Sequence, residues 1–229
     1  MNYLIVVPAR GGSKGIPGKN IYPVNGKPLL EYTLDLFTNS KPENITIAVS
    51  TDSDKIKEVA SKYEYVHVID RPADISGDTA STETALLHAV DYMKDKYGMD
   101  FDAVITLQAT SPLRKPETLG NIIQQFEKDF PKFDAILSLN EDRTDFWKKT
   151  ESGNFERLNK NAPRRRQERE PLFVENSAYY ITGTEALRKT NSVLGTSVNG
   201  FVIDADEAVD INEMTDIYVA EAMLSGKNN

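Results

Sequence analysis

The segment Leu4-Ile-Val-Val-Pro-Ala-Arg-Gly-Gly-Ser-Lys-Gly-Ile-Pro-Gly-Lys-Asn20 joins a short apolar run to a loop that holds four of the chain's 13 glycines. A short apolar run that ends at Pro and Gly is typical of a buried strand. Glycine lets backbone N–H groups approach a ligand closely, and successive N–H groups form an anion-binding concavity. The loop also carries the cations Arg10, Lys14 and Lys19. The segment therefore predicts a first strand followed by a loop that binds a nucleoside triphosphate.

Two familiar phosphate loops are excluded by the spacing of these residues. A P-loop requires Gly, four residues, then Gly-Lys-Ser/Thr, but Ser13 stands five positions before Gly18 and Asn20 follows Lys19. The dinucleotide fingerprint G-x-G-x-x-G also fails, because the glycines stand at positions 11, 12, 15 and 18. The alternative to a phosphate loop is a flexible hairpin whose lysines bind nothing.

The composition limits the class of protein. With 229 residues, 39% of them hydrophobic, we expect one α/β domain spanning 1–229. The net charge of −8 argues against nucleic-acid binding. Zero cysteines and two histidines argue against thiolate metal sites and a Ser-His-Asp triad. We expect neither a signal peptide nor a membrane span, since no apolar run approaches the ~18 residues that a span needs, and hence a cytoplasmic protein.

Strand-like runs alternate with helical patterns in which apolar residues recur every three or four positions. This alternation predicts an α/β fold: a mostly parallel, Rossmann-like sheet covered by helices on both faces. A last helix is expected to bury Met214, Ile217, Tyr218 and Met223. The expected strands are residues 3–8, 45–51, 65–69, 103–107, 135–139, 178–182 and 201–203, and the expected inner helices cover residues 56–63, 86–94 and 119–126.

The alternation breaks in residues 140–172, a polar stretch that we interpret as an insertion. It contains Phe146 and Trp147, which suggest an aromatic anchor for a partner surface. We therefore expect a homodimer that forms through this insertion. The alternative is that Trp147 packs on its own domain.

Polar clusters follow five of the expected strands. Since the carboxyl ends of parallel strands share one edge of the sheet, these clusters predict a ligand site there. The clusters are residues 9–20, 50–54, 71–74, 108–114 and 210–212. Some polar residues have structural alternatives: for Asp52 or Ser53 the alternative is the cap of one helix, and for Asp78 to Ser81 it is the capped start of another. For the arginine run 164–169 the alternative is a solvated surface.

Several motifs in this order resemble the CMP-sialic acid synthetases, including their CMP-legionaminic acid synthetase-like members. The motifs are Pro8-Ala-Arg-Gly-Gly-Ser-Lys-Gly with Lys19-Asn20, Arg71-Pro-Ala, Asp78-Thr-Ala-Ser81 and Gln108-Ala-Thr-Ser-Pro-Leu-Arg114. Arg166-Gln167, Asn176 and Asp210 extend the match over nearly the whole chain. The related eight-carbon Kdo cytidylyltransferases share the opening loop but usually lack the Ser-Pro-Leu-Arg block.

The resemblance implies a role for each matched residue. Asp210 would bind Mg²⁺, and the 140–172 insertion would be a dimerisation arm that brings Lys148 to the partner's sugar carboxylate. The nucleotide would be held by Ala9, Arg10, Gly12, Ser13, Lys14, Lys19, Asn20, Arg71, Ala80 and Ser81. The sugar acid would contact Gln108, Ser111, Lys148, Arg166, Gln167 and Asn176. Of these, Arg10, Lys14, Lys19 and Asp210 would be catalytic.

The implied reaction is attack of the anomeric 2-hydroxyl of a nine-carbon 2-keto sugar acid on the α-phosphorus of CTP, with release of pyrophosphate. The chain departs from many relatives in having Asp210-Ile-Asn212 instead of Asp-x-Asp, and Val193-Leu194 instead of paired aromatics near the acyl group. Two alternatives stay open. One is a nucleotidylyltransferase for a sugar phosphate, a Kdo-like acid or an alcohol, and the other is a non-catalytic nucleotide-binding module.

Overall fold

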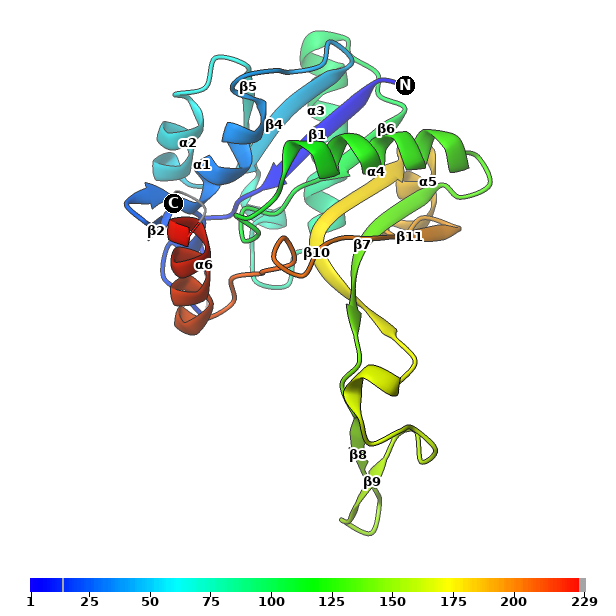
Figure 1. Ribbon diagram of the computed structural model, residues 1–229. Coiled ribbons are helices and arrows are strands. Elements are labelled where there is room, and N and C mark those ends of the chain that lie inside the picture. Colours follow the sequence, from blue (N-terminus) through cyan, green and yellow to red (C-terminus); the bar gives the residue numbers. More distant parts are fainter. Residues whose placement is uncertain (14, 227–229) are drawn as a thin grey trace.

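A sheet of seven strands forms the centre of the computed structural model, which describes residues 1–13 and 15–226. Its strands are β1 (Tyr3–Pro8), β4 (Ile45–Thr51), β5 (Val66–Asp70), β6 (Ala103–Thr106), β7 (Ala135–Asp142), β10 (Leu172–Gly183) and β11 (Val198–Val202). They lie in the order β11-β7-β10-β6-β1-β4-β5 (Figure 1). Within this sheet β10 runs antiparallel to its neighbours β6 and β7, and the other pairs are parallel. The prediction of a mostly parallel sheet is therefore confirmed.

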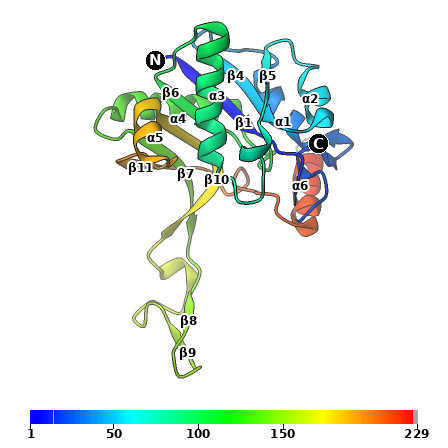
Figure 2. The same ribbon diagram turned by 180° about the vertical axis from the view of Figure 1, so that it is seen from behind.

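Helices cover both faces of the sheet. The helices α1 (Leu29–Leu34), α2 (Asp54–Ala60) and α4 (Pro116–Asp129) pack on one face. The helices α3 (Thr82–Tyr97) and α5 (Thr184–Thr190) pack on the other, which faces the viewer in Figure 2. Short 3₁₀ turns lie at Lys19–Ile21, Asp35–Phe37, Ala73–Ile75 and Arg166–Glu168. No helix in the described parts of the chain is long and apolar enough to cross a membrane.

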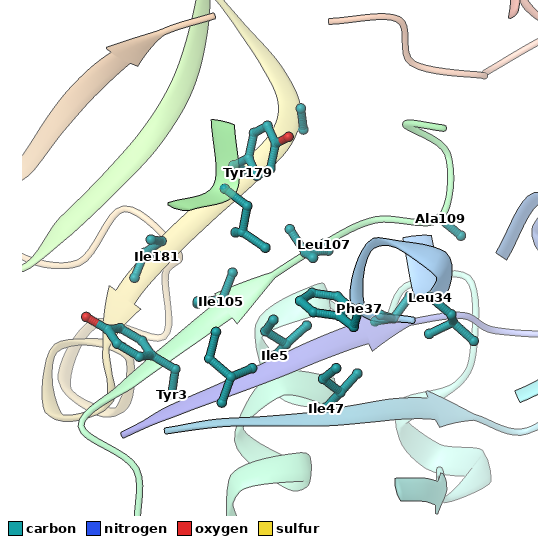
Figure 3. Packing of buried hydrophobic residues seen from close by; sticks show 14 of the residues in the cluster. Tyr3, Ile5, Leu34, Phe37, Ile47, Ile105, Leu107, Ala109, Tyr179 and Ile181 are labelled. Carbon is teal, nitrogen blue, oxygen red and sulfur yellow. The ribbon is translucent and has the colours of Figure 1, made fainter. Parts of the chain in front are cut away.

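Strand β1 shows how the sequence builds the two faces. Successive side chains of a strand point to opposite sides, so Tyr3, Ile5 and Val7 enter the cluster beneath α1, α2 and α4. Leu4 and Val6 enter the cluster beneath α3. Figure 3 shows the first cluster, in which Ile5 lies between the strands that carry Ile47 and Ile105. Burial on both faces explains why this strand is an unbroken apolar run.

A smaller cluster fixes the first loop against the C-terminal helix α6 (Met214–Gly226). Ile16 of the loop packs with Ile211 and with Ile217 of α6. The short hairpin of β2 (Pro23–Val24) and β3 (Lys27–Pro28) completes this corner. The buried face of α6 is Ile217 and Ala220, whereas Met214 and Tyr218 are exposed, so the expected inner face of this helix was partly wrong.

The insertion at 140–172, which we call the arm, projects away from the sheet (Figure 1). The ends of β7 and β10 continue their pairing into it, with Asp142 opposite Leu172. Beyond them β8 (Trp147–Lys149) and β9 (Phe155–Arg157) form a hairpin. Trp147 is 52% exposed and Phe155 is 69% exposed. The alternative in which Trp147 packs on its own domain is therefore wrong, and dimerisation through the arm stays a prediction.

Candidate nucleotide-binding site

A cavity of about 410 Å³ opens at the carboxyl ends of β1, β5 and β6. This volume falls in the range typical of small-ligand sites. The predicted residues that line it are Arg10, Gly12, Ser13, Lys19, Asn20, Arg71, Ala80, Ser81 and Gln108. Pro8, Gly15, Asp78, Thr82, Thr110 and Asn212 complete the lining. The polar clusters predicted a ligand site at the carboxyl ends of the parallel strands, and the structure has a cavity at this edge of the sheet.

The glycines of the first loop serve different purposes. A Cβ on Gly12 would meet no atom within 4 Å, so this residue borders open space in the cavity. A Cβ on Gly15 would lie 2.6 Å from the carbonyl oxygen of Asn212, and Gly18 has a φ of +64°. Gly15 thus permits a close approach of two chain segments, and Gly18 permits a left-handed turn. Of these three, Gly12 best fits the predicted approach of backbone to ligand.

Side chains anchor this loop from beneath. The Asp52 carboxylate accepts the Gly11 N–H through Oδ1 at 2.8 Å. Asn20 donates from Nδ2 to the Arg10 carbonyl at 2.9 Å. Ser53 occupies the N-cap position of α2, as the capping alternative expected, but its side chain makes no capping hydrogen bond. Asp52 does not cap the helix, because its carboxylate faces the loop. The cluster after β4 therefore shapes the loop and does not line the cavity.

Two arginines bring positive charge to the cavity. Arg10 donates from Nη1 to the Gly77 carbonyl at 3.0 Å and forms an ion pair with Asp78 at 2.9 Å. Arg71 is buried and donates to the carbonyl and hydroxyl of Ser50. Burial lowers the pKa of Arg71, the Asp52 charge opposes this shift, and the Arg10 charge adds to it. The positive charges of Arg10 and Arg71 therefore lie close enough to repel each other. Two neighbouring positive charges make the local electrostatic potential favourable for an anion.

Lys19 connects the loop to the segment before α6. Its Nζ donates to the Ile211 carbonyl at 2.8 Å. Burial lowers the pKa of Lys19, and the nearby carboxylates of Asp210 and Asp216 oppose the shift. A partly desolvated ammonium at the wall of a cavity interacts more strongly with a phosphate oxygen than one in bulk water does.

Asp210 lies beside this lysine with one oxygen unused. Its Oδ2 accepts a hydrogen bond from Asn212 Nδ2 at 2.9 Å, whereas the buried Oδ1 has no hydrogen-bond partner among the described residues. Asp216, and not Asp210, accepts the backbone N–H groups of Asn212 and Glu213 at the start of α6. The capping alternative for Asp210 is therefore wrong. Asp210 is not in the lining of the cavity, but its Oδ1 is an unused acceptor next to the lining residues Lys19 and Asn212.

The loop after β6 forms the opposite wall. The side-chain amide of Gln108 lines the cavity and makes no hydrogen bond with a described residue. Thr110 also lines it, and its hydroxyl is buried without a hydrogen-bond partner in residues 1–13 and 15–226. Ser111 is buried outside the lining, and its hydroxyl has no partner in the same part of the chain. Buried polar atoms without partners are rare in folded proteins, so Thr110 is a site residue that sequence reasoning missed, although it stood inside the quoted motif.

The turn before α3 closes one end of the cavity. Ser81 is the N-cap of α3, and its hydroxyl accepts the Thr84 N–H at 3.2 Å. The capping alternative for this segment is therefore confirmed, yet Ala80 and Ser81 also line the cavity. The Ala80 N–H is donated to the Gly77 carbonyl at 3.1 Å, so Ala80 can offer a ligand its carbonyl oxygen but not its N–H.

Comparison with known proteins identifies the family. The family model described as cytidylyltransferase matches residues 4–220. This chain belongs to the cytidylyltransferase family. A pseudaminic acid cytidylyltransferase of Campylobacter jejuni is 28% identical to it, over 97% of this chain and 96% of that protein. A CMP-N,N'-diacetyllegionaminic acid synthase, also of Campylobacter jejuni, is 29% identical, over 98% of this chain and 96% of that protein.

The solved structures agree on the fold. A crystal structure of a 4-diphosphocytidyl-2C-methyl-D-erythritol synthase matches with a TM-score of 0.71, over 97% of this chain and 98% of that chain. At 14% identity this likeness establishes the fold alone. The resemblance to sugar-acid cytidylyltransferases seen in the motifs is confirmed by the family match and by the curated relatives.

Some predicted site residues of this cytidylyltransferase are outside the lining of the cavity, and Ser111 and Asp210 are among them. Ala9 packs in the core, and its N–H donates to the Ser50 carbonyl. Asn176 is buried in a bulge of β10, where its Oδ1 accepts from Ser138 and from the Ala178 N–H. Lys14 lies outside the described residues.

Three predicted sugar-acid contacts lie on the arm, away from the cavity of their own chain (Figure 1). Lys148 is in the β8–β9 hairpin, where it pairs with Glu156 at 3.2 Å. Arg166 and Gln167 are exposed in a 3₁₀ turn. These residues can reach a nucleotide site only if that site belongs to another copy of the chain.

The pair Val193-Leu194 also lies away from the cavity. It follows α5, and the next residues bind Asp134 at the amino end of β7. The cavity lies at the carboxyl ends of the parallel strands, which is the opposite edge of the sheet. In this chain the pair therefore cannot contact a sugar bound in its own cavity.

A larger cavity, of about 970 Å³, lies at the amino ends of the parallel strands and includes Met1, Asp102 and Asp134. Several of its charged groups are already engaged: Asp134 accepts from Thr196 and Ser197, and Arg188 pairs with Asp91. Ligands of open parallel sheets bind at the carboxyl ends. We therefore assign nucleotide binding to the smaller cavity.

Proposed function

We propose that the protein transfers CMP from CTP to the anomeric 2-hydroxyl of a nine-carbon 2-keto sugar acid, such as a sialic, legionaminic or related acid, and releases pyrophosphate. The observation that carries this proposal is the presence of Arg10 and Lys19 in the lining of one cavity, with Asp210 close to Lys19 just outside that lining. The names of the two curated relatives support the sugar-acid class. We also propose a cytoplasmic location, where CTP is available.

The cationic loop would hold the triphosphate. Phosphoryl transfer depends mainly on positioning and on neutralising the charge that develops on non-bridging oxygens. Arg10 and Lys19 supply fixed positive charge, and Gly12 leaves room for close backbone contact. Lys14 is expected to join them. None of these groups needs to gain or lose a proton, and we assign no general base.

The residues present fit a Mg²⁺ ion. Mg²⁺ prefers oxygen ligands and commonly binds through one or two carboxylates together with substrate phosphates. The unpartnered Oδ1 of Asp210 supplies one such oxygen, and no cluster of three or more potential metal-binding side chains occurs within residues 1–13 and 15–226. Asn212 holds the other Asp210 oxygen. When bound, Mg²⁺ would neutralise charge on the phosphates.

The turn at Ala80 and Ser81 predicts the choice of nucleotide. Its Ala80 N–H is occupied, which leaves a carbonyl oxygen for the base edge. Cytosine presents an amino donor at N4, whereas uracil presents an oxygen at this position. We expect kcat/KM for CTP to exceed that for UTP by about 100-fold or more, because a mismatch leaves buried groups unpaired. Comparable pyrophosphate release with UTP or ATP would contradict this assignment.

The acceptor would bind between two copies of the chain. Gln108 faces the cavity of its own chain, and Lys148, Arg166 and Gln167 would come from the partner's arm. The positive charges of Lys148 and Arg166 suit the carboxylate of a sugar acid, which arginine can bind through two parallel hydrogen bonds. Ser111 is buried in the loop that carries Gln108, and Asn176 is buried in the β10 bulge; both would act by shaping these segments.

We therefore expect a homodimer that forms through the arm. A partner surface would bury the exposed apolar side chains of the arm and of the adjoining part of β10. These side chains are Phe146, Trp147, Phe155, Leu158, Leu172, Phe173 and Val174. Trp147→Ser should raise the dimer dissociation constant by about 30-fold, the effect of an interface hot spot, and should lower activity with it. Tyr218→Ser, which removes an exposed aromatic from α6, is the control. Sedimentation of the wild type as a monomer at micromolar concentration would refute the dimer.

The direct test of the function is pyrophosphate release from CTP with a panel of acceptors. We expect release with nine-carbon 2-keto sugar acids and little with a sugar 1-phosphate, Kdo or an alcohol. The fold alone does not choose among them, since a similar structure carries the name of a methylerythritol synthase. Release with another acceptor only would replace the proposed substrate, and CTP binding without release would indicate a non-catalytic module.

A further inference from the structure

Arg114 is buried beneath the cavity and is not part of its lining. Its guanidinium makes four hydrogen bonds to three separate segments of the chain. Nε donates to the Ala178 carbonyl at 2.6 Å, and Nη2 donates to the Gln108 carbonyl at 2.7 Å. Nη1 donates to the Ser111 carbonyl at 2.8 Å and to the Thr33 hydroxyl at 3.1 Å. One side chain thus joins the loop after β6, strand β10 and helix α1.

The contact with Ala178 stabilises a bulge in β10. Ser177 has a φ of +59°, and the pairing of β10 with β7 shifts register between Glu175 and Tyr180. Pairing with β6 begins at Tyr180. Ala178 therefore stands outside the register pairs on both sides, and its carbonyl is bonded by Arg114. A buried carbonyl that lost this donor would be left unsatisfied.

The geometry of these hydrogen bonds explains why an arginine occupies this position. In the described parts of the chain, no carboxylate forms an ion pair with Arg114, and the Tyr179 ring centroid lies 5.6 Å from its Cζ. Burial lowers the pKa of Arg114 to about 10, so the group stays protonated at neutral pH. Only a guanidinium offers five N–H donors in a rigid planar fork. Lysine could keep the charge but not this set of bonds.

The anchored loop reaches both the acceptor side and the Asp210 side of the cavity. Gln108 and Thr110 line the cavity directly. The Thr110 carbonyl accepts the Ile211 N–H at 2.9 Å, next to Asp210. By contrast, Arg10 and Arg71 are held by Asp78 and Ser50, which Arg114 does not touch. The cavity therefore has one wall that depends on Arg114 and one that does not.

We propose that Arg114 is a positioning residue, which fixes the 108–111 loop and the β10 bulge so that Gln108 and the Asp210 segment face a nucleotide held by the opposite wall. This inference rests on the proposed function for its kinetic consequence. Its structural consequence is independent of the substrate. Without the Arg114 guanidinium, the 108–111 loop becomes more mobile, and the Thr110 carbonyl no longer stays in place to accept the Ile211 N–H.

The test compares Arg114→Lys with the wild type and with Glu207→Gln. Glu207 is the matched control, because it is a buried charged residue that binds Lys115, Thr118 and Tyr179 near the start of α4 but not the 108–111 loop. For each protein we would measure the melting temperature, CTP binding, the KM for the sugar acid, and amide hydrogen exchange. Arg114→Met serves as a second variant that removes the charge as well.

We expect Arg114→Lys to lower kcat/KM for the sugar acid by about 100-fold, the cost of misplacing reacting groups by ~1 Å, while CTP binding changes less than about threefold. Exchange should rise at Ser111 and Ile211 and stay unchanged in the 9–20 loop. Glu207→Gln should lower the melting temperature, but it should not lower kcat/KM for the sugar acid selectively relative to CTP binding. The proposal would be overturned if Arg114→Lys weakened CTP binding as much as it lowered kcat/KM for the sugar acid. Unchanged amide exchange at Ile211 in this variant would overturn it as well. If the wild type does not turn over sugar acids, the proposed function is wrong. The amide-exchange data on the Arg114 variants then still decide whether Arg114 positions the loop.

Discussion

Replacing Lys19 with alanine is expected to lower kcat/KM for CTP by about 100- to 1000-fold, which corresponds to roughly 3 kcal/mol of transition-state stabilisation. The ammonium is partly desolvated and stands at the cavity wall, where its charge acts strongly on phosphate oxygens. The fold should survive, since Lys19 lies on a loop outside the apolar clusters. Steady-state kinetics at saturating Mg²⁺ and a melting curve provide the measurement.

The matched control for this loss is Lys27→Ala. Lys27 is also a lysine of the N-terminal region, but it pairs with Asp35 at the surface and does not line the cavity. Its replacement should leave the kinetics near the wild-type values. Arg10→Ala, like Lys19→Ala, should lower kcat/KM for CTP. Near-normal activity of either site variant would show that the triphosphate binds elsewhere.

Replacing Asp210 with asparagine is expected to lower turnover by at least about 100-fold and to raise the Mg²⁺ concentration needed for half-maximal activity. The amide keeps an oxygen that can accept the Asn212 hydrogen bond but loses the negative charge, so several kcal/mol of metal-dependent stabilisation disappear. The measurement is a Mg²⁺ titration with CTP and a nine-carbon keto-sugar acid, beside a melting curve.

Asp216→Asn separates this loss from a general weakening of α6. Asp216 accepts the backbone N–H groups of Asn212 and Glu213, and losing such a cap costs about 1 kcal/mol of stability. We expect the Asp216 variant to melt earlier with a much smaller change in turnover. An Asp210 variant that melts earlier but turns over normally would assign Asp210 to the scaffold.

The central strands were predictable because they are buried on both faces. Apolar and β-branched runs located β1, β4, β5 and β6 to within a residue or two. Two short helices, α1 and α5, were not predicted, because Leu29, Leu30 and Leu34 in α1, and Ala186 and Leu187 in α5, are too few apolar residues to show a helical period. The long antiparallel strand β10 was recognised only at its buried end, since its first four residues, Leu172 to Glu175, are exposed where the strand leaves the arm.

The position of the site was predictable from the sequence, but many of the hydrogen bonds that hold its loops in place were not. The rule that ligands bind at the carboxyl ends of parallel strands placed Arg10, Lys19 and Gln108 together. Nothing local in the sequence links Asp52 to Gly11 or Arg114 to Ala178, because these contacts join residues far apart in the chain. Helical spacing suggested Tyr218 as buried, yet α6 packs only one narrow face, around Ile217 and Ala220.

The central claim is CMP transfer to a sugar acid, and the mass of the nucleotide product tests it most directly. The protein would be incubated with CTP, Mg²⁺ and an equimolar mixture of a sialic, a legionaminic and a pseudaminic acid, Kdo and a sugar 1-phosphate, and the products would be identified by mass spectrometry. We predict a product in which CMP is joined to an intact nine-carbon acid, with one pyrophosphate released for each product formed. A product that carries only Kdo or the sugar phosphate, or no CMP conjugate at all, would contradict the account.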